Sequence, residues 1–175
     1  MPPTPRVLWV AKMIEDAVKQ FLLARRTVPP LDRFEADVEA MKLFNMVVRN
    51  IEAITELAKV DLVLLPSANV LARVVFEIAI KATWMITPND PFEREVRWLA
   101  HLQEEERIQE RLARKVVPFG GDPTHFNKHR DQLRNFRTGV VSALPPGYAE
   151  LPGDPSVEQM LESIGQTRDW RSKWR

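Results

Sequence analysis

The 175-residue sequence contains no cysteine and only 6 glycines. Without cysteine the chain has no disulfide, no thiolate chemistry and no cysteine-ligated zinc site, and this absence fits a cytoplasmic protein. An excess of charge is also lacking, because 25 lysines and arginines balance 24 aspartates and glutamates. No net field therefore draws the whole chain toward nucleic acid or a membrane, and any such attraction must be local.

Signals for secretion and for β-strands are scarce as well. The N-terminus, M-P-P-T-P-R, has no basic segment followed by an apolar core and a cleavage site, so we expect a cytoplasmic location. Alternating runs of β-branched residues are few, which argues against sheets. At 45% hydrophobic residues, a chain of this length buries a sizeable core, and we expect one domain spanning residues 1–175.

The sequence does contain apolar segments with helical spacing, separated by prolines that mostly occur in clusters. This pattern predicts an all-α bundle of five to six helices. The expected helices cover residues 6–26, about 32–65 with a break near Val60–Asp61, 67–87, 91–116, 123–143 and 156–175. Their starts carry capping residues: Ser67, Asp90 before Pro91, Asp122 before Pro123, and Ser156 with Gln159 in a capping box. The middle of helix 91–116, Q-E-E-E-R-I-Q-E-R, is expected to be solvated.

The segment from Pro66 to Pro88 is the most apolar long stretch of the chain. Its apolar residues fall on nearly all faces of a helix, which predicts the central core helix of a soluble bundle. Three charges interrupt it, namely Arg73, Glu77 and Lys81, and they stack in one stripe. Each would cost about 2.5–3.5 kcal/mol at the middle of a bilayer, so we expect no membrane partner.

Arg73 and Glu77 are candidate binding residues, because a charge in a buried helix is costly unless it has a partner. One interpretation places both in a polar site inside the bundle. The alternative is a structural ion pair that fixes helix register, or a charged stripe at the bundle edge.

Arg94, Arg97 and His101 lie on one side of helix 91–116, since seven positions are two helical turns. Histidine acts as a general base near neutral pH, and arginine holds phosphate and stabilises developing negative charge. The segment R-E-V-R-W-L-A-H resembles the motif of HEPN ribonucleases, an arginine followed by four to six residues and a histidine. HEPN proteins are small helical bundles that cut RNA without a metal. The alternative is an exposed histidine beside a salt-bridged arginine.

His125 and His129 have the i, i+4 spacing at which two imidazoles on one helix share a metal ion. The glutamate that completes the zinc-protease motif is absent from positions 126–128, and no third ligand is identifiable. We therefore predict neither a metal nor a cofactor.

Basic residues gather on the fifth predicted helix and in the C-terminal tail. Three arginines share one face of that helix: Arg130, Arg134 and Arg137. The tail R-D-W-R-S-K-W-R places Trp170 and Trp174 one turn apart among four basic residues. Basic residues interleaved with aromatics suit phosphate contact and base stacking, and hence RNA. The alternative is that both tryptophans pack on the bundle or on a partner.

The segment L-A-R-V-V-F-E-I-A-I-K-A-T-W-M-I, followed by F-E-R-E-V-R-W-L, resembles an uncharacterised bacterial family of helical proteins that is distantly HEPN-like. Arg73 and Glu77 match the arginine and glutamate of the family's first helix, and Arg94 or Arg97 matches the arginine of its second. Family members continue with a tyrosine-rich helix and a serine-to-histidine segment. Because this sequence ends before them, we expect either a truncated chain or a partner that completes the bundle.

Three functions are therefore open. The first is a HEPN-like protein that binds or cleaves RNA in a defence or toxin–antitoxin setting, which the resemblance implies. The second is a non-catalytic interaction or oligomerisation module, in which another protein or a second copy docks on the Trp170/Trp174 tail. The third is a small-molecule binding bundle in which Arg73 holds an acidic ligand. The RNA hypothesis ranks first because it alone uses the polar residues of helices 67–87 and 91–116 together, and whether the chain is an enzyme stays open.

Overall fold

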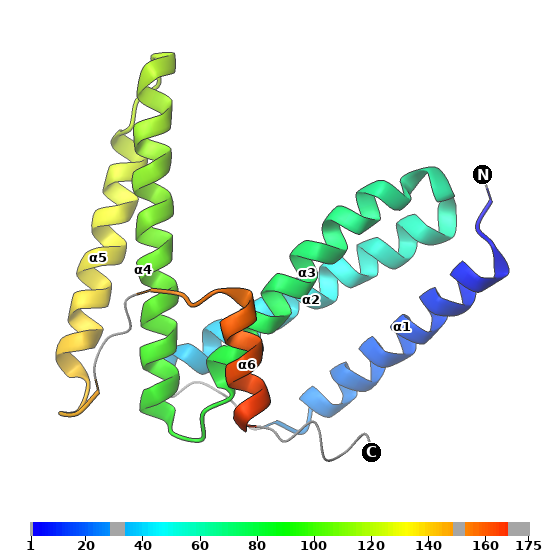
Figure 1. Ribbon diagram of the computed structural model, residues 1–175, viewed down its shortest axis with the longest axis horizontal. Helices are drawn as coiled ribbons and strands as arrows, with labels where there is room; N and C mark the ends of the chain where they lie inside the picture. Colours follow the sequence, from blue (N-terminus) through cyan, green and yellow to red (C-terminus); the bar gives the residue numbers. More distant parts are fainter. Residues whose placement is uncertain (1, 29–33, 149–152, 168–175) are drawn as a thin grey trace. The chain divides into compact units, whose positions relative to one another are not determined.

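The computed structural model describes residues 2–28, 34–148 and 153–167, and this part of the chain is all-α, with six α-helices and no strand (Figure 1). The predicted fold class is confirmed. The helices are α1 (Pro5–Arg25), α2 (Glu35–Val60), α3 (Leu65–Ile86), α4 (Pro91–Val116), α5 (Thr124–Ala143) and α6 (Val157–Thr167). Two short 3₁₀ turns, η1 (Leu62–Leu64) and η2 (Val117–Phe119), follow α2 and α4.

Contacts between residues gather in two compact units, which we call the N-terminal unit (residues 1–83) and the C-terminal unit (residues 84–175). The boundary falls inside α3, so the last turn of this helix belongs to the C-terminal unit. The sequence predicts a single domain, and that remains a prediction. Each unit is described below by itself.

Several helix ends follow the capping signals in the sequence. At the start of α4 the Asp90 carboxylate accepts a hydrogen bond from the backbone N–H of Phe92 at 3.0 Å. At the start of α6 the backbone N–H of Ser156 donates to the Gln159 side chain at 2.8 Å, and the N–H of Gln159 donates to the Ser156 hydroxyl at 3.3 Å. The predicted cap of α4 and the capping box of α6 are thus confirmed.

Between α2 and α3 the chain differs from the prediction in one respect. The break near residues 60–61 is confirmed, because α2 ends at Val60 and Asp61 caps the η1 turn by accepting the N–H of Val63 at 3.0 Å. Helix α3 then begins at Leu65, so Ser67 lies inside the helix and is not its cap. The predicted start of the second helix and residues 168–175 of the last one lie outside the described residues.

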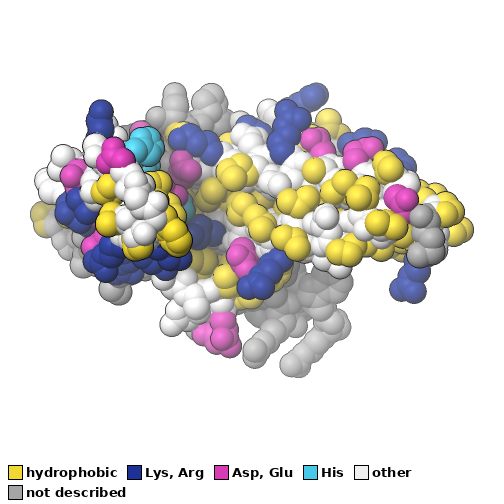
Figure 2. Space-filling model, turned by 90° about the horizontal axis from the view of Figure 1, so that it is seen from above, with side chains coloured by type: hydrophobic (Ala, Val, Ile, Leu, Met, Phe, Trp, Pro, Cys, Tyr) yellow, Lys and Arg dark blue, Asp and Glu magenta, His cyan; other side chains and the backbone are white. Residues whose placement is uncertain are grey.

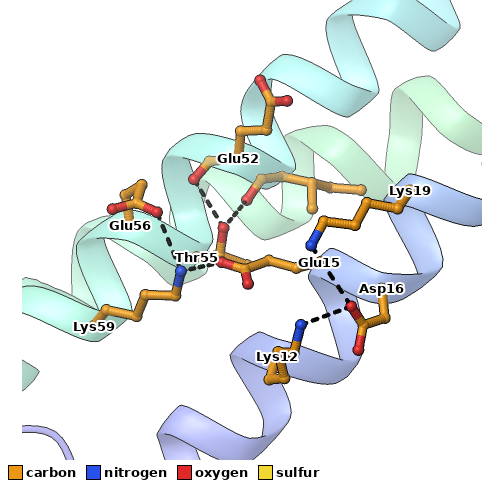
Figure 3. Close-up of polar contacts among 9 residues, drawn as sticks. Lys12, Glu15, Asp16, Lys19, Glu52, Thr55, Glu56 and Lys59 are labelled. Atoms are coloured by element: carbon orange, nitrogen blue, oxygen red, sulfur yellow. Dashed lines mark hydrogen bonds and ion pairs between the residues drawn. The ribbon is translucent and has the colours of Figure 1, made fainter. Parts of the chain in front are cut away.

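In the N-terminal unit α1 packs against α2. The rings of Phe21 and Phe44 lie 5.8 Å apart, and Lys59 of α2 forms an ion pair with Glu15 of α1 (Figure 3). Of the 21 residues of α1 only Ala11 is buried, so this helix is held along a single narrow stripe.

Helix α3 is not the buried core helix that its composition predicts. Val70, Val74 and Phe76 are exposed large apolar residues, and burial is concentrated toward the C-terminal end, at Ile80, Ala82 and Trp84. The stretch Leu62–Ile86 is long and apolar enough to cross a bilayer, and only 17% of its most apolar window is buried. The expected absence of a membrane partner stays a prediction.

The C-terminal unit has a buried core of its own. Its largest fully buried side chains are Met85, Leu99 and Met160. Helices α4 and α5 form an antiparallel hairpin (Figure 1), in which Trp98 and Phe136 meet edge to face with ring centroids 5.6 Å apart. Aromatic pairs prefer this edge-to-face arrangement.

Candidate functional site

The polar side of α4 in the C-terminal unit holds the three residues predicted to be catalytic. The Arg97 guanidinium donates to the backbone carbonyl of Trp84 at 2.6 Å and to the Glu93 carboxylate at 3.1 Å, and it lies 3.5 Å from the Ser163 hydroxyl of α6. It also stacks on the Trp84 ring, 5.0 Å from its centroid. Burial lowers the pKa of the Arg97 guanidinium, and the neighbouring Glu93 carboxylate raises it in part.

One turn further along α4, His101 faces an acidic residue that the sequence analysis did not identify. The Nδ1 atom of His101 lies 3.4 Å from the Asp154 carboxylate. Their side chains are 14% and 8% exposed, so the alternative of an exposed histidine is wrong. A carboxylate beside an imidazole fixes its orientation and tautomer, as a general base requires.

Arg94 contacts a different segment. Its guanidinium donates to the backbone carbonyls of Pro88 at 3.1 Å and Asn89 at 3.3 Å, in the linker that leads into α4. The structure therefore brings Arg97 and His101 together against the 153–163 segment, and it turns Arg94 toward the linker. All three side chains contact other parts of their own unit.

All three arginines of α5 contact acidic residues. Glu106 of α4 is buried, with a side chain that is 7% exposed, and it lies 2.5 Å from Arg137 and 3.3 Å from Arg134. Arg130 contacts its neighbour Asp131 at 2.7 Å. The prediction that the glutamate-rich middle of helix 91–116 is solvated is wrong for Glu106, because this residue faces α5 and not water.

Arg73 and Glu77 form an ion pair in the N-terminal unit, with Nε and Oε1 3.0 Å apart. The predicted pairing is confirmed. The prediction that these two charges are buried is wrong, because the Arg73 side chain is 83% exposed and that of Glu77 is 46% exposed. The pair lies on the outer side of α3, at the unit's surface.

The other residues singled out in the sequence are the two histidines of α5 and the two tryptophans of the tail. Neither His125 nor His129 takes part in a group of three or more possible metal ligands anywhere in the described part of the chain. The imidazole of His125 instead lies 5.8 Å from the ring of Phe126. Trp170 and Trp174 lie outside the described residues.

The most extensive feature that the sequence analysis missed is an apolar groove in the N-terminal unit. It consists of two adjoining hollows of about 290 Å³ each, which share Ile14. One is lined by α1 and α2, at residues including Ala17, Phe21, Phe44 and Val47. The other is lined by α1, α2 and the first turns of α3, at residues including Val10, Ile54, Leu65 and Ala72. Apolar residues of α1 that would ordinarily pack against a neighbouring helix therefore line an open hollow.

Other large apolar side chains of α1 and α3 are exposed. We call them the apolar face: Trp9, Val10, Met13 and Phe21 of α1, and Val70, Val74 and Phe76 of α3. Figure 2 shows hydrophobic side chains spread over the N-terminal helices, with charges scattered between them. The sequence feature that could have predicted these exposed residues is that α1, like α3, carries apolar residues outside a single stripe.

A further hollow between α1 and α2 is lined by charged residues as well as apolar ones such as Val18 and Ile51. This hollow has a volume of about 360 Å³, and its charged and polar lining residues include Glu15, Lys19, Glu52 and Thr55 (Figure 3). The hydrogen bond from Lys59 lowers the pKa of the Glu15 carboxyl below its usual range. Charged side chains at this hollow contact one another, as in the ion pair of Lys59 with Glu15.

Comparison with protein-family models, with curated proteins and with solved structures finds no match to this chain.

Proposed function

We propose that this chain is a non-catalytic interaction module whose N-terminal unit docks another polypeptide through the apolar face. The observation that carries the proposal is the open apolar groove between α1, α2 and α3, in a unit that also exposes Trp9, Met13 and Phe76. Exposed apolar surface marks interaction sites in proteins.

The size of the surface supports the proposal. An aromatic side chain has about 150–250 Å² of surface. Trp9, Phe21 and Phe76 are 62%, 38% and 55% exposed, so together they leave on the order of 300 Å² uncovered. The largest patch on a typical monomer is about 300–600 Å² and is often functional.

The arginines expected to hold RNA provide less support for the RNA hypothesis. Arg97 and Arg137 are largely enclosed, and they contact the Trp84 carbonyl and the Glu106 carboxylate. A phosphate would have to replace these contacts before either guanidinium could bind it.

A photo-reactive amino acid in place of Trp9 tests the proposal in the full chain. Trp9 is 62% exposed, so the replacement leaves the fold intact. We expect irradiation in cells to join position 9 to another polypeptide, and the adduct to disappear when Met13→Asp is added. The matched control places the same group at Gln132, an exposed polar position on α5, where no adduct is expected.

Absence of a polypeptide adduct at position 9 would contradict the proposal. Flotation of the purified chain with anionic lipid vesicles would contradict it as well, because it would identify a membrane as the occupant of the apolar face.

RNA cleavage is the second candidate function, and the Asp154–His101 pair favours it. With Nδ1 held by the carboxylate at 3.4 Å, the other ring nitrogen of His101 is oriented for proton transfer. Incubation with labelled single-stranded RNA in the presence of a chelator tests this candidate. Chelator-resistant cutting that is lost in His101→Ala would support it, and cutting that persists in that variant would exclude His101 as the base.

A further inference from the structure

We propose that the outer side of α3 pairs with the same side of α3 in a second copy of this chain, with the two helices antiparallel. The inference rests on the interaction function proposed above and names the partner for the α3 part of the apolar face. Three properties of α3 support it: an apolar side that the unit's own core leaves exposed, the charges on that side, and the symmetry of those charges.

Helix α3 carries apolar residues on two sides. One side lies inside the N-terminal unit, where Ala68, Val75 and Ala82 are buried. These three residues are seven positions apart, which is two helical turns, so they form a single inner stripe. The core of the unit therefore uses only one side of this helix.

The other side is exposed and carries Val70, Arg73, Val74 and Glu77, which we call the outer stripe. Their spacing of three, one and three residues places all four on one side of the helix. Val70 is 67% exposed and Val74 is 42% exposed. None of the four residues lines the groove. Because a helix that is apolar nearly all round is normally buried, we expect a partner to cover the outer stripe.

The charges in the outer stripe favour a polypeptide over a bilayer as that partner. Arg73 and Glu77 form an ion pair at 3.0 Å, and their side chains are 83% and 46% exposed. They lie near the middle of Leu62–Ile86, the stretch that is long and apolar enough to cross a bilayer. Arg73 alone would cost about 2.5–3.5 kcal/mol at mid-bilayer, whereas a protein surface with opposite charges pairs with both residues.

This ion pair is complementary to itself when two copies are antiparallel. Residue 75 is halfway between Arg73 and Glu77, so a two-fold axis at that level brings Arg73 of one copy to the level of Glu77 of the other. The four side chains then form a ring of alternating charge. In a parallel pair each residue would face its own counterpart, and like charges would meet. The order of the charges therefore favours an antiparallel pair of identical helices.

The same axis brings one valine of the outer stripe close to its counterpart and keeps the other apart. Val74 is one residue from the level of the axis, so its two copies are about 3 Å apart along the helices. Val70 is five residues from that level, so its two copies are about 15 Å apart along the helices. One helix from each copy makes a small interface, so we expect a reversible dimer.

Cysteine at one of these two positions tests the pairing directly, because the chain has no cysteine of its own. We expect Val74→Cys in the purified full chain to give a covalent dimer with a short thiol-to-thiol crosslinker. The matched control is Val70→Cys, which lies on the same stripe and is more exposed. We expect no covalent dimer from this control, because its two copies are too far apart.

Charge reversal tests the ring of alternating charge. Arg73→Glu leaves four carboxylates at the centre of the dimer and Glu77→Arg leaves four guanidinium groups, so each variant alone should have a dimer Kd at least about tenfold above that of the wild type. A mixture of the two variants restores opposite charges, and we expect the mixed dimer to have a Kd within about threefold of the wild-type value.

The matched control reverses an exposed charge of the C-terminal unit that is also paired at i, i+4 spacing. Arg114→Glu removes the ion pair with Glu110, and its dimer Kd should equal that of the wild type. Sedimentation equilibrium of the purified full chain over a wide concentration range gives each Kd, and circular dichroism checks that each variant is helical.

Three results would overturn the pairing. Equal crosslinking at positions 70 and 74 would contradict the antiparallel arrangement, and a dimer that neither charge reversal weakens would use another surface. A wild-type chain that sediments as a monomer at every concentration has no self-pairing. If such a monomer still cross-links from position 9 to a different polypeptide, the proposed interaction function survives while the second-copy inference fails.

Discussion

Replacement of Glu106 by glutamine tests the assignment of the α5 arginines to the structure of the C-terminal unit. Glu106 is buried and lies 2.5 Å from Arg137 and 3.3 Å from Arg134. Removing one charge of a buried ion pair costs about 3–5 kcal/mol, because the remaining charge stays desolvated. Arg134 is 54% exposed and reaches water, so we expect Glu106→Gln to lower the free energy of unfolding by about 2–3 kcal/mol.

Urea unfolding of the full chain measures this loss when it is monitored by hydrogen exchange of the α4 and α5 amides. With a slope of about 1–3 kcal/mol per molar urea, the unfolding midpoint of these helices should fall by roughly 0.7–3 M. The control is Glu110→Gln on the same helix, whose exposed pair with Arg114 should contribute no more than about 1 kcal/mol.

A double substitution separates the cost of a stranded charge from that of lost packing. Glu106→Met with Arg137→Met removes both charges and keeps similar volumes, so we expect a stability within about 1 kcal/mol of the wild type. If Glu106→Gln were as mild as the Glu110→Gln control, the α5 arginines would not depend on Glu106, and their predicted role in RNA binding would gain weight.

Three further outcomes are expected. The hydrogen bond from Tyr148 to Asp90 raises the pKa of the phenol, so ultraviolet titration of this sole tyrosine should give a midpoint above the usual value of 10.0, and Asp90→Asn should lower it. The hydrogen bond from Lys59 lowers the pKa of Glu15, so the stabilisation by this ion pair is present above the usual value of 4.5 and is lost as the pH falls through the lowered pKa. Hydrogen exchange of the α1 amides should accelerate in that pH range in the wild type and change less in Lys59→Met. Met160→Ala should cost about 2–5 kcal/mol, because this side chain is fully buried, and should accelerate exchange of α6 amides while leaving α1 unchanged.

Helix positions could be predicted from the sequence because local signals determine them. Asp90 followed by Pro91 starts α4 as expected, since a short acidic side chain caps the helix and proline tolerates the first position. The end of α2 near residue 60 could be predicted from helix length alone.

Burial could not be predicted in the same way. The composition of a segment such as α3 shows that the helix has a large apolar surface. It does not show which other segment packs against that surface. Val70 and Phe76 are therefore exposed here despite lying in the most apolar stretch of the sequence. Placing Arg97 and His101 on one side of α4 needed only the helical repeat, but Asp154 lies 53 residues beyond His101, and no periodicity relates residues so far apart.

Glu106 is a charged residue whose burial could likewise not be predicted from the sequence. A glutamate within Q-E-E-E-R-I-Q-E-R has the composition of a solvated surface, yet it is 6% exposed because α5 brings two arginines to it. Charge in the sequence thus predicted solvation where the tertiary structure provides an ion pair.

The most direct test of the central claim is to measure whether the apolar face is covered in solution. Carbene labelling of the full chain in cell extract, read out by mass spectrometry, gives the reactivity of Trp9 and Met13 relative to Phe119. In the structure these side chains are 62%, 51% and 91% exposed. We predict that in the extract Phe119 is strongly labelled, whereas Trp9 and Met13 are protected. Labelling of Trp9 and Met13 in proportion to their exposure in extract would contradict the account.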